Sequence, residues 1–289
     1  MYEQISSNKR RTVILLLSFI ILLWALAYLV SEATGQRGLL FFIGLFSLSY
    51  ALISYFAGAK MALAVNKAKE ISKKDNPRLW RTVENLAITE GLPMPKVYIM
   101  EDPALNAFAT GRNPDHAAVC ATTGLLHATT DTELEGVMAH ELAHIKNYDM
   151  RVNTIAFALV GIISMIGDFF WHISIFGGND RREGNQLVQV LAIVAIILAP
   201  IAATLIQLAI SRRREYLADA TGALTTRYPE GLASALEKIG AHGSATKIQN
   251  TATAHMFFSN PLSGKAVAGL FSTHPPVEAR IAALRQMNL

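Results

Sequence analysis

Residues 137–150 read VMAHELAHIKNYDM, and this stretch decides how the rest of the chain is interpreted. His140 and His144 stand four residues apart, and Glu141 directly follows the first of them. Side chains four apart on a helix lie on one face, so both imidazoles would point the same way. The stretch is either a metal site that cuts peptide bonds or an ordinary exposed helix with two histidines.

A helix is the expected setting, because Thr130 and Glu133 have the spacing of a capping box just upstream. Two histidines on one helix face can bind one tetrahedral zinc ion. Zinc lowers the pKa of water to about 7, and a nearby carboxylate can move protons to and from the reacting groups. Glu141 is the glutamate of this motif, so its carboxylate is the one placed to move these protons. The H-E-x-x-H pattern arises by chance in about one percent of chains this long, so it needs support from elsewhere.

A zinc hydrolase needs a third protein ligand and an open coordination position. The longer pattern H-E-x-x-H-x-x-G-x-x-H is absent, because Asn147 stands at its glycine position and Met150 at its last histidine position. Asp149 is one residue short of that last position. The third ligand is therefore expected from another helix.

The segment EYLADATGAL offers the best source of that ligand, because Glu215 and Asp219 are four apart on a predicted helix. A glutamate could bind the metal while an aspartate one turn away holds the other ring nitrogen of a ligand histidine. The alternative is a solvated carboxylate pair that balances the arginines at residues 212–214.

The composition points to a membrane protein. Hydrophobic residues make up 52% of the 289 residues and charged residues 17%, against about 25% charged in a typical soluble domain. Mean hydropathy is +0.31. A helix of about 20 apolar residues crosses the hydrocarbon layer of a bilayer. Four runs are candidate spans, at residues 12–30, 39–59, 152–176 and 187–210.

The third of these runs is the weakest, because its uncharged part ends at Asp168 and His172 follows shortly after. These two residues are interpreted as an interfacial pair beside an aromatic belt. The sharper alternative is a second ion site, since ionisable groups inside a membrane segment are often functional.

Basic residues cluster at 9–11, 60–69 and 212–214, which lie on one side of the membrane if all four runs span it. The positive-inside rule makes that side the cytoplasm. The net charge of +4 is thus mainly an orientation signal, and we expect no nucleic-acid partner because no binding motif or aromatic-basic pattern accompanies it. A single cysteine, Cys120, agrees with a reducing compartment.

The segments between the apolar runs predict a mainly α fold with a small β-sheet, of the α+β class. Expected strands are 96–100, 107–111 and 117–126. Expected helices are 76–92, the one that begins at residue 130, 211–224, 229–243 and 275–287.

This pattern divides the chain into four parts. Residues 1–60 form an N-terminal membrane pair, and residues 152–210 form a second membrane or membrane-associated pair. Residues 61–151 and 211–289 are the two halves of one protease-like domain, since neither half looks sufficient for a core of its own.

Four short motifs in order, NAFATG, HELAH, EYLAD and THPPVEAR, resemble those of the M48 peptidases, in particular their bacterial heat-shock members. The likeness covers nearly the whole chain. It implies a gluzincin-type fold, one Zn²⁺ per chain and a multi-pass protein of the bacterial inner membrane. It also implies that the N-terminus and the active site are cytoplasmic.

The resemblance also implies roles for individual residues. His140, His144 and Glu215 would be the metal ligands and Glu141 the general base. Asp219 would support a ligand histidine from behind.

Three further positions match the family motifs with looser roles. Asn106, in NAFATG, would lie on a strand edge beside the cleft and help to hold the substrate backbone. His274 and Arg280, in THPPVEAR, would stabilise an oxyanion or brace the carboxylates. A simple helix start with a capped arginine is the alternative for these last two.

The function that follows is a membrane-anchored zinc metalloendopeptidase that cleaves misfolded or damaged membrane proteins on the cytoplasmic side. Its partners would be polypeptide substrates, the lipid bilayer and other quality-control proteases. Two alternatives stay open. One is a relative that cuts prenylated CaaX proteins, and the other is a membrane scaffold with a structural metal and no turnover.

Overall fold

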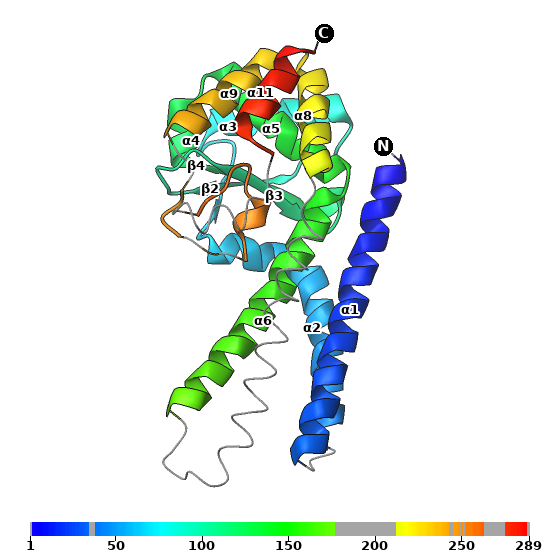
Figure 1. The fold of residues 1–289 in the computed structure, drawn as a ribbon. Coiled ribbons are helices and arrows are strands. Elements are labelled where there is room, and N and C mark those ends of the chain that lie inside the picture. The colour runs from blue at the N-terminus through cyan, green and yellow to red at the C-terminus, as the bar shows by residue number, and fades with distance from the viewer. Residues whose placement is uncertain are drawn as a thin grey trace.

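The computed structural model describes residues 2–34, 38–176, 212–242, 245–248, 250, 252–262 and 275–287. Figure 1 shows a domain of helices around a small sheet, from which long helices extend in one direction. These long helices are α1 (Tyr2–Thr34), α2 (Gly38–Val65) and α6 (Asp149–Phe176). The described part of the chain is therefore mostly helical, as the sequence predicts.

Helix α5 (Asp131–Lys146), which carries the two histidines, begins at the predicted capping box. The Glu133 amide donates to the Thr130 hydroxyl at 3.4 Å, and the Thr130 amide donates to the Glu133 carboxylate at 2.7 Å. Nearly every side chain of the helix after its first turn is buried, so α5 lies inside the domain. The alternative of an exposed helix with two histidines is therefore wrong.

Three further helices pack against α5. They are α3 (Pro77–Glu90), α8 (Arg212–Thr226) and α9 (Pro229–His242), with α11 (Val277–Arg285) packed on α9. All four coincide with predicted helices. The two segments that flank residues 152–210 thus share one hydrophobic core around α5.

The sheet has the order β1-β2-β4-β3, with β2 and β4 parallel and the two outer pairs antiparallel. Its strands are β1 (Lys69–Glu70), β2 (Lys96–Met100), β3 (Ala107–Gly111) and β4 (Ala117–Thr122). The two-residue strand β1 was not predicted.

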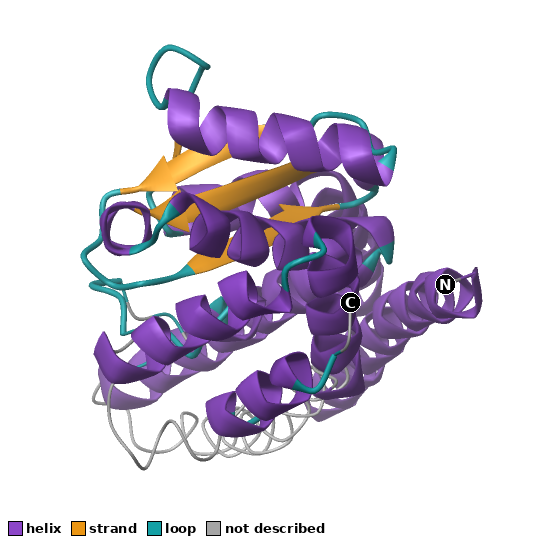
Figure 2. Cartoon of the chain, turned by 90° about the horizontal axis from the view of Figure 1, so that it is seen from above, coloured by secondary structure: helices purple, strands orange, loops and turns teal. Residues whose placement is uncertain are grey.

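Helices lie on both faces of this sheet (Figure 2). Along β4, Val119 and Ala121 join the core around α3 and α5, whereas Ala118 and Cys120 join a second core with α1, α2 and α6. The sheet therefore lies between the core around α5 and the core formed with the long helices, whereas the ends of α1 and α6 pass beside it toward α5.

The predicted strand at 117–126 is too long. It ends at Thr122, whose hydroxyl accepts from the amide of Leu125 at 3.2 Å and so caps the short helix α4 (Thr123–Ala128). Gly124 fits here because a Cβ would lie 2.1 Å from the carbonyl oxygen of Pro103. An apolar run this short does not distinguish strand from helix by its pattern.

The expectation of four membrane spans is not confirmed. Among the described residues, one helical segment, Phe41–Val65, is long and apolar enough to cross a membrane. The runs at 12–30 and 152–176 lie within the continuous helices α1 and α6. The run at 187–210 lies outside the described residues, and the roles of Asp168 and His172 stay predictions.

Candidate metal centre

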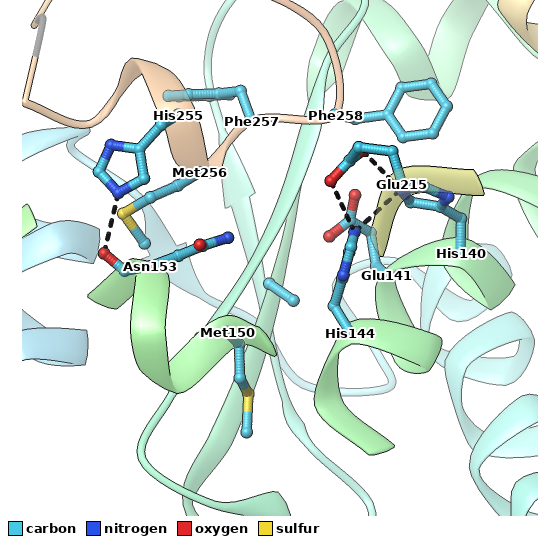
Figure 3. A pocket seen from close by; sticks show the side chains of 11 residues that line it. His140, Glu141, His144, Met150, Asn153, Glu215, His255, Met256, Phe257 and Phe258 are labelled. Atoms are coloured by element: carbon cyan, nitrogen blue, oxygen red, sulfur yellow. Dashed lines mark hydrogen bonds and ion pairs between the residues drawn. The ribbon is translucent and has the colours of Figure 1, made fainter. Parts of the chain in front are cut away.

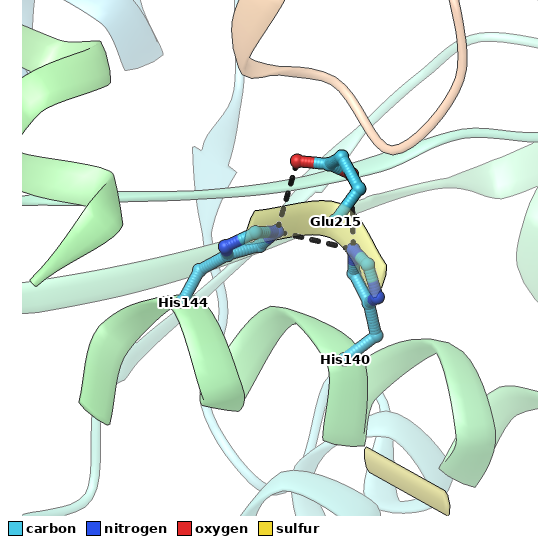
Figure 4. A group of neighbouring side chains, drawn as sticks. All are labelled: His140, His144 and Glu215. Carbon is cyan, nitrogen blue, oxygen red and sulfur yellow. Dashed lines mark hydrogen bonds and ion pairs between the residues drawn. The ribbon is translucent and has the colours of Figure 1, made fainter. Parts of the chain in front are cut away.

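Three predicted ligands meet at one point (Figure 4). The Nε2 atoms of His140 and His144 lie 3.1 Å apart, and each lies 3.6 Å from a carboxylate oxygen of Glu215. Two ligand atoms bound to a tetrahedral zinc at about 2.0–2.1 Å are about 3.3 Å from each other. The donor set and its spacing therefore fit a metal ion of this kind.

The close approach of α5 and α8 brings these ligands together. Gly222 of α8 lies against the backbone of α5, because a Cβ there would be 2.9 Å from the amide nitrogen of His140. Glu215 precedes Gly222 by about two turns on the same helix, so it reaches the same face of α5. The glycine thus sets the helix spacing on which the ligand set depends.

A buried chain of contacts supports His140 from behind. Its Nδ1 lies 2.8 Å from Asp219 Oδ1, and Arg280 donates to both oxygens of Asp219 at 2.6 and 2.8 Å. Burial opposes the charge of Asp219, but the Arg280 guanidinium outweighs it, so the pKa of Asp219 falls to about 2. Asp219 is therefore an ionised acceptor that fixes the orientation of the imidazole ring.

The pKa of His140 is raised in the same network. Burial lowers it, but the hydrogen bond with Asp219 and the nearby carboxylate of Glu215 outweigh burial and raise the pKa of His140 to about 9. A histidine binds a metal in its neutral form, so metal binding at neutral pH releases a proton from this ring.

Glu141 lies beside the three ligands in the same pocket (Figure 3). Its side chain is buried, and burial raises the pKa of this carboxyl against the opposing effect of His140 and His144. A carboxyl with a raised pKa next to a metal site suits proton transfer near neutral pH.

The rest of the pocket lining comes from β3, from the start of α6, and from the short helix η2 (Ala254–Met256) with the two residues that follow it. Its residues are Ala109, Met150, Asn153, His255, Met256, Phe257 and Phe258 (Figure 3). The cavity that these residues line has a volume of only about 10 Å³. It is therefore closed to a peptide in this conformation.

Sequence reasoning assigned no site role to His255, yet the residue lines the pocket. Its Nε2 lies 3.0 Å from the carbonyl oxygen of Asn153, 102 residues away in sequence. Burial lowers the pKa of His255 to about 4, so the ring is neutral. No spacing signal in the sequence links such distant residues.

The predicted role of Asn106 in holding the substrate backbone stays a prediction. Asn106 is fully buried just before β3 and does not line the pocket. Its amide nitrogen donates to the carbonyl of Ser259 at 2.8 Å, and its oxygen accepts from the Ser259 amide at 3.1 Å. Asn106 thus holds the segment after η2 against the sheet. Arg280 lies beside the site as described above, and His274 is outside the described residues.

The buried triad of two histidines and a glutamate on two helices, with a further carboxyl beside it, defines the class of a metallopeptidase. Residues 73–288 match the model of Peptidase family M48. The chain belongs to this family, and it is a metallopeptidase.

Relatives of similar length support this assignment. The Protease HtpX homolog of Tropheryma whipplei (strain Twist) is 51% identical over 289 residues, covering 100% of this chain and 99% of the relative. Protease HtpX homologs of Dictyoglomus turgidum and Listeria monocytogenes serotype 4a are 44% and 42% identical, each covering 99% of this chain and 95% and 100% of the relatives. The likeness extends over the apolar runs as well as the metal centre.

A solved structure shares the fold. The crystal structure of S. mikatae Ste24p matches with a TM-score of 0.52 and 18% identity, covering 98% of this chain and 67% of that chain. At this identity the match concerns the fold alone.

Proposed function

We propose that this chain is a zinc-dependent endopeptidase of the bacterial inner membrane that cleaves misfolded or damaged membrane proteins on the cytoplasmic side. The observation that carries the proposal is the metal-binding geometry of His140, His144 and Glu215 with Glu141 beside it. The long apolar helix at Phe41–Val65 supports the membrane location.

The three ligands would hold the zinc ion. When bound, zinc supplies Lewis acidity and makes water a nucleophile at neutral pH. Asp219 accepts the Nδ1 proton of His140, so Nε2 is the ring nitrogen that would give up its proton and bind the metal. Arg280 fixes Asp219 through two hydrogen bonds, and the ligand geometry is thereby set before the metal binds.

Glu141 would act as general base and then as general acid. Its carboxylate takes a proton from the attacking water, and the resulting carboxylic acid gives a proton to the leaving amine nitrogen. Burial raises the pKa of Glu141, which favours holding the proton between these two transfers. The residue thus serves both halves of peptide hydrolysis.

The edge of β3 is the proposed site for the substrate backbone. Phe258 donates its amide to the Ala107 carbonyl at 2.8 Å, and Gly111 donates its amide to the Thr154 hydroxyl at 3.2 Å. Ala109 lies between these two bonds and lines the pocket. A peptide paired with Ala109 would gain main-chain hydrogen bonds with little sequence preference, which suits unfolded substrates. The segment around η2 has to move to admit it.

The cytoplasmic side is proposed from the basic clusters. In Figure 1 the N-terminus lies at the level of α8, and the Asn8 and Arg214 side chains are 3.5 Å apart. The basic residues 9–11 and 212–214 therefore lie at the same level as the metal centre. Their excess on this side supports a cytoplasmic active site by the positive-inside rule.

The test is degradation of casein by detergent-purified protein, compared with Glu141→Gln and with Glu135→Gln on the same helix. We expect one zinc per chain in all three proteins. Because general acid–base catalysis contributes about 10²–10⁴-fold, Glu141→Gln should lose at least about a hundredfold in rate while the control keeps its activity. Wild-type activity in Glu141→Gln would overturn the mechanism.

The same assay separates the alternatives. A farnesylated C-terminal peptide cut in preference to casein would favour a CaaX-processing enzyme. Bound zinc without cleavage of either substrate would favour a scaffold. The intact Glu141 supports turnover, since a structural metal site needs no base.

A further inference from the structure

Asp149 contacts the second ligand histidine from behind. Its Oδ2 lies 3.2 Å from Nδ1 of His144, on the ring edge opposite to the metal-facing Nε2. Asp149 is 1% exposed and is the first residue of α6. The arrangement repeats on His144 what Asp219 does for His140.

Two other elements hold Asp149 in place. Asn8 of α1 donates from Nδ2 to Asp149 Oδ1 at 2.7 Å and also to the carbonyl of Asn147 at 2.8 Å. Nη1 of Arg214, in α8, lies 3.4 Å from the same Oδ1 and compensates the buried negative charge. The carboxylate thus connects three helices that are far apart in sequence.

Both polar atoms of the Asn8 side chain have partners in this network. The residue is 1% exposed, both hydrogens of its Nδ2 have acceptors, and its Oδ1 lies 3.5 Å from Arg214 Nη1. Burying an amide is costly unless its groups are hydrogen-bonded, and here every partner belongs to the surroundings of His144. The side chain of Asn8 therefore links α1 to the residues around His144.

We propose that Asp149 is a positioning residue for His144 and that Asn8 positions Asp149, so the N-terminal helix α1 forms part of the metal centre. The Asp149 carboxylate accepts the Nδ1 proton of His144, which fixes the tautomer whose Nε2 binds the metal. This inference rests on the proposed zinc-dependent function. It means that separation of α1 from the domain loosens the site.

The experiment measures zinc affinity of the full-length, detergent-purified protein by competition with a chelator. Loss of such a supporting contact typically weakens metal affinity by about 10–100-fold, and we expect this for Asp149→Asn. Asn8→Leu, of similar volume, should weaken affinity in the same direction by a smaller factor. The control is Thr12→Val, one turn further along α1, because the Thr12 hydroxyl donates only to the carbonyl of Asn8 within its own helix.

A second readout separates positioning from simple loss of stability. Co²⁺ replaces Zn²⁺ at such sites, and its visible absorption reports the ligand geometry. We expect a changed Co²⁺ spectrum in Asp149→Asn and Asn8→Leu and an unchanged one in Thr12→Val. In the double variant the affinity loss should be close to that of Asp149→Asn alone, since both changes break one network.

The outcomes distinguish this inference from the proposed function. If the wild-type protein takes up no zinc, or if Glu141→Gln degrades casein normally, the proposed function fails. If the wild type binds zinc but Asp149→Asn and Asn8→Leu match Thr12→Val in affinity and Co²⁺ spectrum, only this inference fails. If Asp149→Asn does not fold, the comparison of Asn8→Leu with Thr12→Val tests the inference.

Discussion

The buried charge of Arg280 holds the Asp219 carboxylate that supports the ligand His140. Arg280 is 1% exposed, bonds both oxygens of Asp219 and lies with its guanidinium carbon 4.7 Å from the centre of the Phe258 ring. The sequence left three roles open, which are an oxyanion contact, a brace for carboxylates and a simple helix start with a capped arginine, and the burial and contacts of Arg280 favour the brace. The planar guanidinium suits this place because it can donate two parallel hydrogen bonds to one carboxylate.

We predict that Arg280→Met lowers the free energy of unfolding by about 3–5 kcal/mol, because it leaves Asp219 as an uncompensated buried charge. Arg280→Lys should cost less but still reduce activity, since an ammonium cannot bond both oxygens in the same way. Chemical unfolding in detergent measures the first effect and casein degradation the second. Arg285→Lys is the matched control on the same helix, with exposed partners, and should leave stability nearly unchanged. An equal loss of stability in Arg280→Met and Arg285→Lys would show that Arg280 does not stabilise the Asp219 carboxylate.

The residues predicted from the sequence are those connected by local spacing. His140 and His144 are one turn apart on α5, and so are Glu215 and Asp219 on α8, so helical periodicity was enough to group each pair. Asp149 was considered only as a metal ligand, and its contact with His144 depends on the turn between α5 and α6, which helical periodicity does not describe. His255 was given no role because its contact with Asn153 joins distant segments. Asn106 was placed beside the cleft by family motif alone, and no sequence pattern indicated its pairing with Ser259.

At the scale of elements, the first turn of α5 is anchored to α9 by side-chain contacts. Glu133 accepts from Lys238 at 2.7 Å and from Ser234 at 2.6 Å, so the capping box of α5 is also its link to α9. Burial opposes the charge of Glu133, but these hydrogen bonds and those of Thr130 lower the pKa of Glu133 to about 2. The helix that carries the ligands is thus held at its start by a charged contact.

We predict a pH-dependent contribution of Glu133 to stability. Because its folded-state pKa lies below the ordinary value of 4.5, the contribution is complete above pH 4.5 and is lost as the pH falls toward about 2. Glu133→Gln should lower the free energy of unfolding at pH 7 by about 1.5–3 kcal/mol and flatten the acid limb of the stability curve. Unfolding monitored by circular dichroism at several pH values measures both. Lys238→Met should reduce the same pH dependence; a curve identical to wild type would contradict the assignment.

Elements with strong end signals were predicted well, and those without them were not. Helix α3 begins at Asn76, whose side chain accepts from the amide of Leu79, and ends at Gly91 in the left-handed conformation. These are the signals that the sequence displays. Strand β1 has only two residues and therefore no periodicity, and α4 is an apolar run whose cap, Thr122, could equally continue the strand.

At the scale of the molecule, the sheet divides two environments. One core contains α5 and its neighbours, and the other joins the second face of the sheet to α1, α2 and α6. Along α1, large apolar side chains such as Leu17, Ile21 and Trp24 are more than half exposed. The hydrophobic runs in the sequence were enough to locate the long helices. They could not show that α1 contacts the metal centre, because this contact depends on one polar side chain, Asn8.

The proposed orientation of the molecule places α1 across the membrane with its N-terminal end on the cytoplasmic side. Ser6 and Lys74 are exposed positions at the proposed cytoplasmic level, and Glu32 is exposed near the other end of α1. Single cysteines at these positions, in a Cys120→Ala background, can be probed in spheroplasts with a membrane-impermeant maleimide. Cys120 is 1% exposed, so its removal serves only to eliminate a background signal.

We predict that Glu32→Cys reacts in intact spheroplasts, whereas Ser6→Cys and Lys74→Cys react only after the membrane is opened. The physical reason is the basic cluster at residues 9–11, which resists transfer to the outer side of the membrane. Labelling of all three after detergent treatment is the control for accessibility. Reaction of Lys74→Cys in intact spheroplasts would place the metal centre outside the cytoplasm, and the proposed substrates would then have to be sought on that side.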